Sequence, residues 1–195
     1  VAVRQSLAQG TIEKYLQKLK VQQDDVFYIP AGTVHGIGAG NLIVEVQESS
    51  NLTYRLYDYD RVDKAGQKRE LHLEKALAVA DLKGKAAPRQ PLRVLRYTPG
   101  SATEFLCRCK YFQVERLLLN TEGKSKLAEL YTGSSSFQAL LCLDGEGYIL
   151  TEDKEKLAIV KVIVFLFLQI PENCSYAVGV SFEDIMLINL NLFKL

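Results

Sequence analysis

The ten residues "VFYIPAGTVH" (26–35) join a strand-like apolar run to a turn and a histidine. Val26 to Ile29 are β-formers, and the Pro-Ala-Gly that follows is a turn signal. His35 comes three residues after Gly32 and is one of only two histidines in the chain. A core strand has no need of an imidazole, so the pattern favours a residue that holds a ligand at the mouth of a β-barrel.

Strand patterns continue on both sides of a flexible "GIGAG" turn. Two further strands are predicted at 41–49 and 53–60, and helices are predicted at 10–20 and within 69–84, the latter stopping at Gly84. Thr11 is the expected N-cap of the first helix. Beyond residue 92, short apolar runs separated by turns predict six more strands, at 112–120, 137–143, 146–150, 162–169, 176–180 and 185–190. Such regular spacing is typical of an all-β sandwich or barrel.

The composition of "KAAPRQP" (85–91) is that of a linker between two parts of the chain. We therefore expect one domain at 1–84 and a second at 92–195. Three strands after one helix cannot close a barrel alone, which predicts that the first domain lacks an N-terminal part. The chain opens on Val1, and its only methionine is Met186, in agreement with this expectation.

Charge and cysteine content exclude several classes of protein. The net charge of +1 gives no electrostatic reason to expect nucleic acid or a membrane surface as a partner. The longest apolar run, 158–170, contains Lys161 and is shorter than the roughly 18 residues of a membrane span, so it is expected to be a buried strand. The four cysteines have no zinc-finger spacing, and we expect small buried side chains in a reducing cytoplasm.

Three residues are candidates for a site, and each has a structural alternative. His35 could be a zinc ligand or a hydrogen-bonded turn residue. Glu45 could be a ligand or general base, or a solvated residue on a strand face. Arg55 stands among aromatic residues, where a partly buried guanidinium needs an anion. That anion could be Asp58 or Asp60, or a phosphate or sugar oxyanion.

The order of five motifs resembles the later part of the catalytic domain of type I, zinc-dependent mannose-6-phosphate isomerases. These are "IPAGTVH", the glycine-rich loop, "EVQ", "TYRLYDYDR" and "HLEKAL". The resemblance implies a cupin-type (jelly-roll) fold and the interconversion of mannose 6-phosphate and fructose 6-phosphate. It further implies that His35 binds Zn²⁺, that Glu45 lies in the substrate pocket and that Arg55 is the catalytic arginine.

The sequence also departs from the family pattern. The family takes further zinc ligands from an upstream Q-x-H motif and a glutamate, and no Q-x-H occurs here. His72 is expected to be a packing or capping residue. We therefore expect residues 1–195 alone to bind zinc weakly and to be inactive, within a parent protein that is an active isomerase on a sugar phosphate. The second domain has no histidine and is expected to be a cupin-like domain without metal ligands. The alternative function is a non-catalytic cupin module that binds a sugar or a partner protein.

Overall fold

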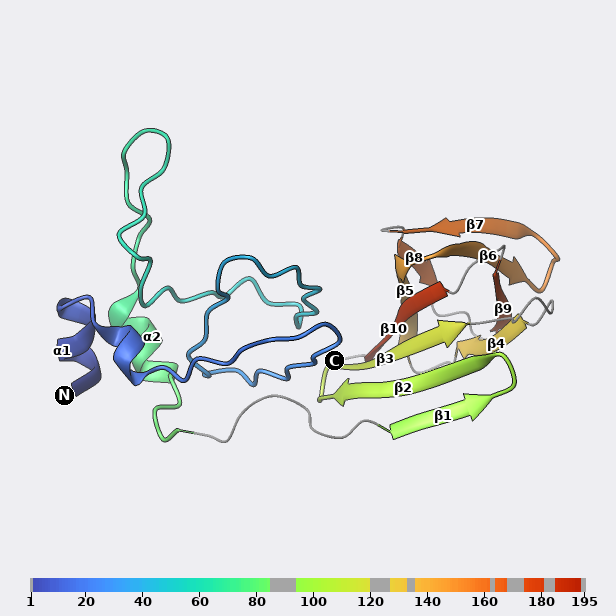
Figure 1. Cartoon of the computed structure of the whole chain (residues 1–195), viewed down its shortest axis with the longest axis horizontal. Coiled ribbons are helices and arrows are strands. Elements are labelled where there is room, and N and C mark those ends of the chain that lie inside the picture. Colours follow the sequence, from blue (N-terminus) through green and yellow to red (C-terminus); the bar gives the residue numbers. More distant parts are fainter. Residues whose placement is uncertain are drawn as a thin grey trace. The chain divides into compact units, whose positions relative to one another are not determined.

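The computed structural model describes residues 2–84, 94–119, 127–132, 136–161, 164–167, 174–180 and 185–193. The chain divides into two compact units, Val1–Arg89 and Gln90–Leu195 (Figure 1). The expected linker at 85–91 lies outside the described residues. No helix among the described residues has the length and apolar character that a membrane crossing requires.

The second unit is a jelly roll of antiparallel strands. Its strands are β1 (Val94–Thr98), β2 (Ser101–Arg108), β3 (Phe112–Leu119), β4 (Leu127–Thr132), β5 (Ser136–Asp144), β6 (Glu146–Thr151), β7 (Lys156–Val160), β8 (Val164–Phe167), β9 (Cys174–Val180) and β10 (Ile185–Phe193). One sheet has the order β1-β2-β3-β10-β5-β8 and the other β4-β9-β6-β7. From β3 to β10 this is the strand order of a jelly roll, with β1 and β2 added at one edge. The mostly β, jelly-roll character expected from the sequence is confirmed.

Apolar side chains from both sheets form the core of the jelly roll. Leu117 and Leu119 of β3, Leu140 and Cys142 of β5, Ile149 of β6 and Ile159 of β7 make one buried cluster. Leu140, Cys142, Ile149 and Ile159 have no exposed surface. A second buried contact is polar: Arg116 of β3 donates through Nε to Glu104 of β2 at 2.6 Å, directly across the strand pair. The core thus joins the two sheets, and a charge pair links neighbouring strands of one of them.

The structure corrects the prediction of one buried strand over 158–170. The chain forms two strands there, β7 and β8, which belong to different sheets and are separated by a turn at Lys161. Lys161 is exposed and donates to Asp144 at 2.9 Å, so the charge marks a corner rather than the interior of a strand. The sequence prediction also missed β1, β2, β4 and β7. β1 and β2 are joined by Pro99-Gly100, where Gly100 has a φ of +83° that suits the second central position of a tight turn.

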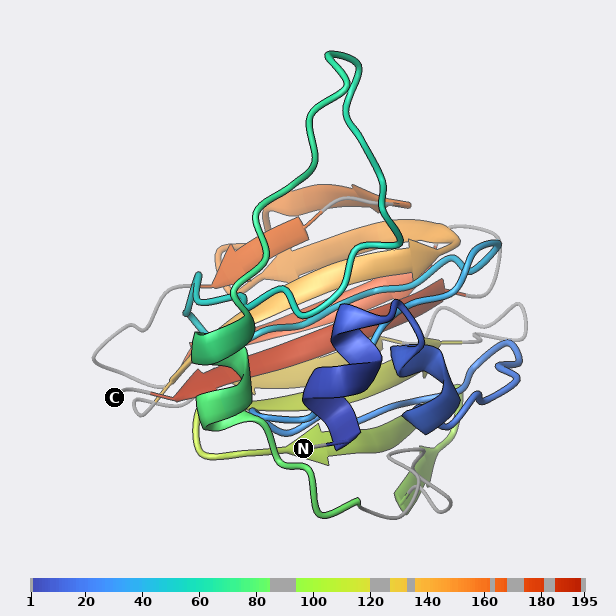
Figure 2. The ribbon, with the colours of Figure 1, turned by 90° about the vertical axis from the view of Figure 1, so that its left-hand side faces the viewer.

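The first unit contains short helices. α1 spans Ala2–Ala8, a 3₁₀ helix (η1) spans Ile12–Tyr15, and α2 spans Leu73–Val79. The predicted helix at 10–20 is therefore reduced to one 3₁₀ turn, because the chain is already extended at Leu16. Thr11 precedes this turn but makes no capping bond through its side chain. Figure 2 shows α1 beside α2, and a salt bridge between Arg4 and Glu74 joins the two helices.

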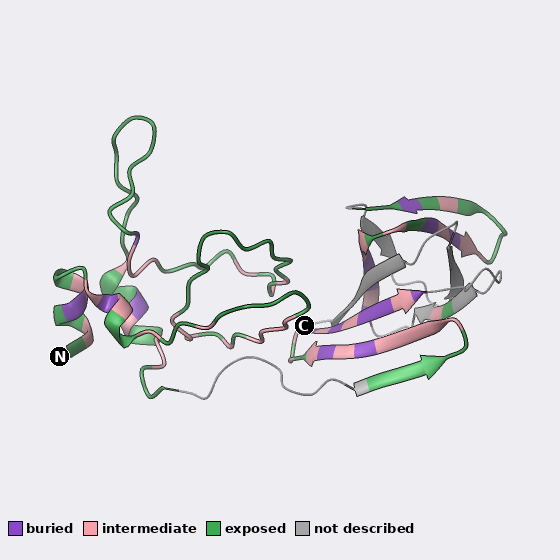
Figure 3. Ribbon diagram, viewed as in Figure 1, coloured by how far each residue is buried: buried purple, intermediate pink, exposed green. Residues whose placement is uncertain are grey.

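The strands predicted at 26–29, 41–49 and 53–60 are not formed in the first unit. Within its described residues the only β contacts are isolated bridges, at Phe27 and between Val62 and Lys68. A β-ladder needs a neighbouring strand about 4.8 Å away, and these segments find none. Much of residues 36–54 is consequently exposed (Figure 3), including Leu42, whose relative exposure is 101%. The α2 helix, by contrast, lies within the predicted range 69–84, but it ends at Val79 and not at the predicted stop, Gly84.

Candidate functional site

The turn before His35 is fastened to the C-terminal end of α2. Thr33 N–H donates to Pro30 O at 3.1 Å, which closes the turn. Gly32 has a φ of +85°, and its carbonyl accepts a hydrogen bond from Asp81 N–H at 2.8 Å. A Cβ at Gly32 would lie 2.8 Å from the carbonyl oxygen of Val79. Only glycine therefore fits this position without displacing the turn from the helix.

We expect Gly32→Ala to destabilise the first unit by about 1–3 kcal/mol, since it adds backbone strain and a steric clash with Val79. Urea denaturation would measure the loss in free energy of unfolding. Hydrogen exchange at the Asp81 amide would show whether its bond to the Gly32 carbonyl is weakened. Gly40→Ala is the matched control, because Gly40 has a φ of +78° but no atom lies within 4 Å of the point that a Cβ would occupy. Equal losses for the two variants would show that the contact with α2 contributes nothing.

The His35 side chain is exposed, and one ring nitrogen is fixed. Nδ1 lies 2.8 Å from the Thr33 carbonyl oxygen. A carbonyl only accepts, so Nδ1 carries the proton and Nε2 keeps its lone pair. Metal-binding histidines commonly have this arrangement, in which a backbone carbonyl selects the tautomer. His35 is thus both a turn residue and a side chain suited to bind one metal ion through Nε2.

The described residues do not supply the rest of a zinc site. Nowhere among them do three His, Cys, Asp or Glu side chains come together. Glu45 is exposed, in the irregular part of the first unit. A catalytic zinc takes about three protein ligands. His35 therefore fits as one ligand, and a complete set is not present in the part of the chain that the structure describes.

Arg55 is half-buried and is held by residues 70–72. Its guanidinium donates through Nη1 to the Glu70 carbonyl oxygen at 3.0 Å, and its backbone N–H donates to His72 Nδ1 at 3.1 Å. Of the two alternatives for the anion near Arg55, the pairing with Asp58 or Asp60 is not formed among the described residues, where both carboxylates bind other bases. A backbone carbonyl is a neutral acceptor, so this contact leaves the positive charge of Arg55 uncompensated.

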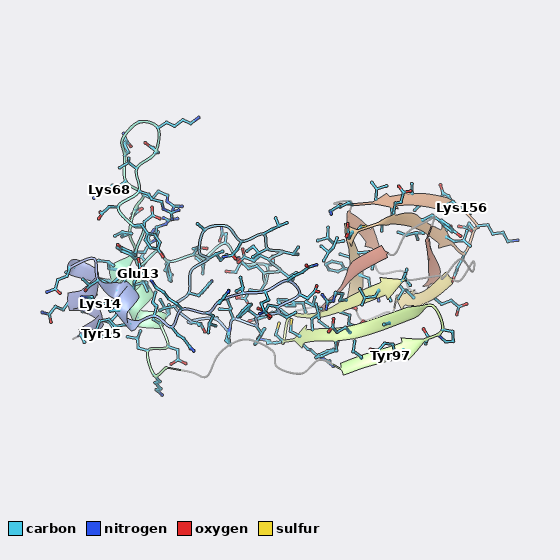
Figure 4. The ribbon with its side chains drawn as sticks, viewed as in Figure 1. Glu13, Lys14, Tyr15, Lys68, Tyr97 and Lys156 are labelled. Atoms are coloured by element: carbon cyan, nitrogen blue, oxygen red, sulfur yellow. The ribbon has the colours of Figure 1, made fainter. Side chains whose placement is uncertain are left out.

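Asp58 and Asp60 pair with other bases in what we call the Asp58 clamp, defined by Asp58, Asp60, Arg61, Lys68 and Arg69. Arg69 binds both carboxylate oxygens of Asp58, through Nε at 2.7 Å and through Nη2. Arg61 Nη2 donates to Asp58 at 2.5 Å, and Lys68, labelled in Figure 4, donates to Asp60 at 2.5 Å. The clamp lines a small hollow of about 160 Å³, together with Leu7, Ala8, Gly10, Tyr57 and Leu71. It ties the segment that follows Arg55 to the one that precedes α2.

Asp58 is the buried member of the clamp, with 6% of its surface exposed. Hydrogen bonds from Arg69 are the largest cause that lowers the pKa of Asp58 from 3.8 to about 2; burial opposes them, and Arg61 adds to the lowering. A carboxyl whose pKa is lower in the folded state stabilises the fold above its unfolded pKa. That contribution is lost as the pH falls through the folded pKa.

Stability of the first unit is therefore expected to decline between about pH 4 and pH 2 as Asp58 is protonated. Asp58→Asn should lower the stability at neutral pH and remove most of this pH dependence. Urea denaturation at several pH values measures both effects. Asp153→Asn, at an exposed aspartate of the second unit, is the control outside the clamp. If the stability of Asp58→Asn fell at low pH as steeply as that of the unchanged protein, the role assigned to this carboxylate would be contradicted.

Sequence reasoning missed the clamp bases and the contact between His72 and Arg55. The segments "YDYDR" and "QKRE" do place acids and bases close together, which is the only signal available. The assignment of His72 to packing or capping is incomplete: it occupies the N-cap position of α2 without a side-chain capping bond, and its ring binds Arg55 instead. Cys107, Cys109 and Cys142 are free thiols, and burial raises the pKa of Cys107 and Cys142.

Comparison with known proteins gives related sequences, although no family model matches the chain. Over 145 residues it is 35% identical to mannose-6-phosphate isomerase ManA of Bacillus subtilis, covering 74% of this chain and 44% of the relative. Over 89 residues it is 46% identical to the mannose-6-phosphate isomerase of Streptococcus mutans, covering 46% of this chain and 28% of the relative. The chain thus spans less than half the length of these curated relatives.

A solved structure shows the same fold. The crystal structure of the mannose 6-phosphate isomerase from Bacillus subtilis matches with a TM-score of 0.55 and 24% identity. The match covers 72% of this chain and 40% of that chain. At this identity the likeness concerns the fold, and the sequence matches establish the relationship.

Proposed function

Since this chain is homologous to mannose-6-phosphate isomerases, we propose that it forms part of a zinc-dependent enzyme that interconverts mannose 6-phosphate and fructose 6-phosphate. The observation that supports the proposal most is the 35% identity to ManA over 145 residues. Because the chain spans less than half of that relative, the activity is assigned to a complete isomerase that contains residues 1–195.

The reaction moves a carbonyl between C1 and C2 of the sugar. A proton leaves the carbon next to the carbonyl, and negative charge develops on oxygen in the enediol-like transition state. A fixed cation close to that oxygen lowers the barrier. We assign this role to Arg55, whose guanidinium is held at Nη1 by Glu70 O and makes no ion pair among the described residues.

Two further residues of the first unit are assigned to the same pocket. His35 would give Nε2 to a zinc ion, and a bound zinc would supply Lewis-acid polarisation of the sugar oxygens. Because the described residues hold no full ligand set, other zinc ligands would come from elsewhere in the complete isomerase. The exposed carboxylate of Glu45 is assigned to the substrate hydroxyls.

The test is conversion of mannose 6-phosphate to fructose 6-phosphate by the complete protein, with bound metal measured in parallel. We expect turnover that is lost on dialysis against a chelator and restored by Zn²⁺. Unphosphorylated mannose is the control for recognition of the phosphate. Absence of turnover in a folded, zinc-supplied protein would reject the proposal and favour a non-catalytic module that binds a sugar or a protein.

A further inference from the structure

His72 and Arg55 are joined by a reciprocal pair of hydrogen bonds. The backbone N–H of Arg55 donates to the His72 ring at Nδ1, at 3.1 Å, and the backbone N–H of His72 donates to the Arg55 carbonyl oxygen at 2.8 Å. The two residues are 17 positions apart in the sequence. One histidine therefore binds both backbone polar groups of a single arginine, one through its ring and the other through its own backbone.

The neighbouring contacts fix the orientation of the imidazole. Since Nδ1 accepts from an N–H, the ring proton of neutral His72 is on Nε2. Nε2 lies 3.8 Å from a carboxylate oxygen of Glu70, and the Tyr54 ring lies 6.1 Å away between centroids. The side chain of His72 is 25% exposed, so the bond to Arg55 is partly shielded from water. Partial shielding makes the loss of this acceptor more costly than it would be on the surface.

The same short segment also holds the guanidinium of Arg55. Glu70 contributes its carbonyl oxygen to Arg55 Nη1, two residues before the imidazole that holds the Arg55 backbone. Residues 70–72 thus hold both the backbone of Arg55 and the end of its side chain. A substitution at His72 is therefore expected to change the direction of the Arg55 side chain while the contact of the guanidinium with Glu70 O is left in place.

We propose that His72 is a positioning residue for Arg55, which holds the arginine backbone through Nδ1 and so aims the guanidinium at the reacting sugar. This inference rests on the proposed role of Arg55. A misplaced catalytic group can lower the rate by up to about a hundredfold even though every reacting group is present. Substrate affinity should change much less, because the proposal gives His72 no contact with the sugar.

The test compares His72→Leu, which removes the acceptor, with His72→Asn, whose amide oxygen can lie near the original Nδ1 position. In the complete isomerase we expect kcat of His72→Leu to fall about 10- to 100-fold with KM changed by less than about threefold, and His72→Asn to recover most of the loss. Lys75→Ala is the matched control, since it changes an exposed side chain of the same helix and leaves residues 70–72 unchanged.

A second measurement does not depend on activity. In ¹⁵N NMR spectra of the 195-residue chain, His72 should show an unprotonated Nδ1 and a protonated Nε2 at neutral pH. The Arg55 amide signal should shift in His72→Leu and stay close to its original position in His72→Asn. A proton on Nδ1, or an Arg55 amide signal that shifts in neither variant, would overturn the inference. If these signals behave as expected while Arg55→Ala retains normal turnover, the contact between His72 and Arg55 stands, but the catalytic role of Arg55 and the positioning role of His72 are both rejected.

Discussion

His35→Ala is expected to remove both bound metal and turnover from a complete isomerase that contains residues 1–195. Nε2 of His35 is the proposed zinc-binding atom, and the Thr33 carbonyl already fixes the tautomer that leaves it unprotonated. A catalytic zinc has about three protein ligands, so the loss of one removes a large part of its affinity. Elemental analysis after dialysis, together with the mannose 6-phosphate assay, measures both effects.

The isolated 195-residue chain provides the complementary experiment. With His35 as one ligand and no group of three in the described residues, it should retain little zinc through dialysis and show no isomerase activity. Thr33→Ala is the matched control, because it leaves the backbone carbonyl that holds Nδ1 in place. A complete isomerase that stays metal-loaded and active with His35→Ala would show that this histidine has only a structural role in its turn.

Arg55→Ala should lower kcat of the complete isomerase by about 10²–10³-fold, the usual loss for one group that stabilises developing negative charge. The fold should tolerate the change, because within the described residues the guanidinium makes one hydrogen bond, to Glu70 O, and both backbone bonds to His72 remain. Steady-state kinetics and thermal denaturation of the same samples separate the two effects.

Arg55→Lys and Arg96→Ala complete this comparison. Lysine keeps the charge but not the planar fork of donors, so we expect partial activity. Arg96 is an exposed arginine of β1 in the other unit, and its removal should leave turnover unchanged. Normal kcat in a folded Arg55→Ala protein would exclude Arg55 from the mechanism. The backbone hydrogen bonds between residue 55 and His72 would then serve only to stabilise the fold.

The sequence predicted most of the strands that have two neighbours in a sheet, with β2 as the exception. β3, β5 and β10 carry continuous apolar or alternating patterns because they lie in the middle of the larger sheet. β1 is exposed at the sheet edge, so its side chains show little hydrophobic pattern. Residues 41–49 have a clear strand pattern but no ladder. The alternation of apolar and polar residues shows that a segment is suited to form a strand. Whether the strand forms depends on a neighbouring strand elsewhere in the protein.

The candidate site could be predicted in part, through motif resemblance and side-chain chemistry. His35 and Arg55 were selected this way, and the structure adds the groups that hold them. The partner of Arg55 could not be predicted from local sequence, because Asp58 is nearer in the chain than His72 but is already bound by Arg69. Which of several nearby acids and bases pair is decided by the path of the loop from residue 58 to residue 69.

The helix α2 supports both proposed site residues, one at each end. At its N-cap, His72 holds Arg55, and just beyond its last turn Asp81 N–H holds the Gly32 carbonyl in the turn that leads to His35. Seven helical residues rise only about 10 Å, so this helix is a short strut between the two residues. A shift of α2 along its axis would carry the imidazole of His35 and the guanidinium of Arg55 in the same direction. Their spacing therefore depends on one short helix, and mutations in α2 are expected to disturb the proposed zinc ligand and the proposed catalytic arginine together.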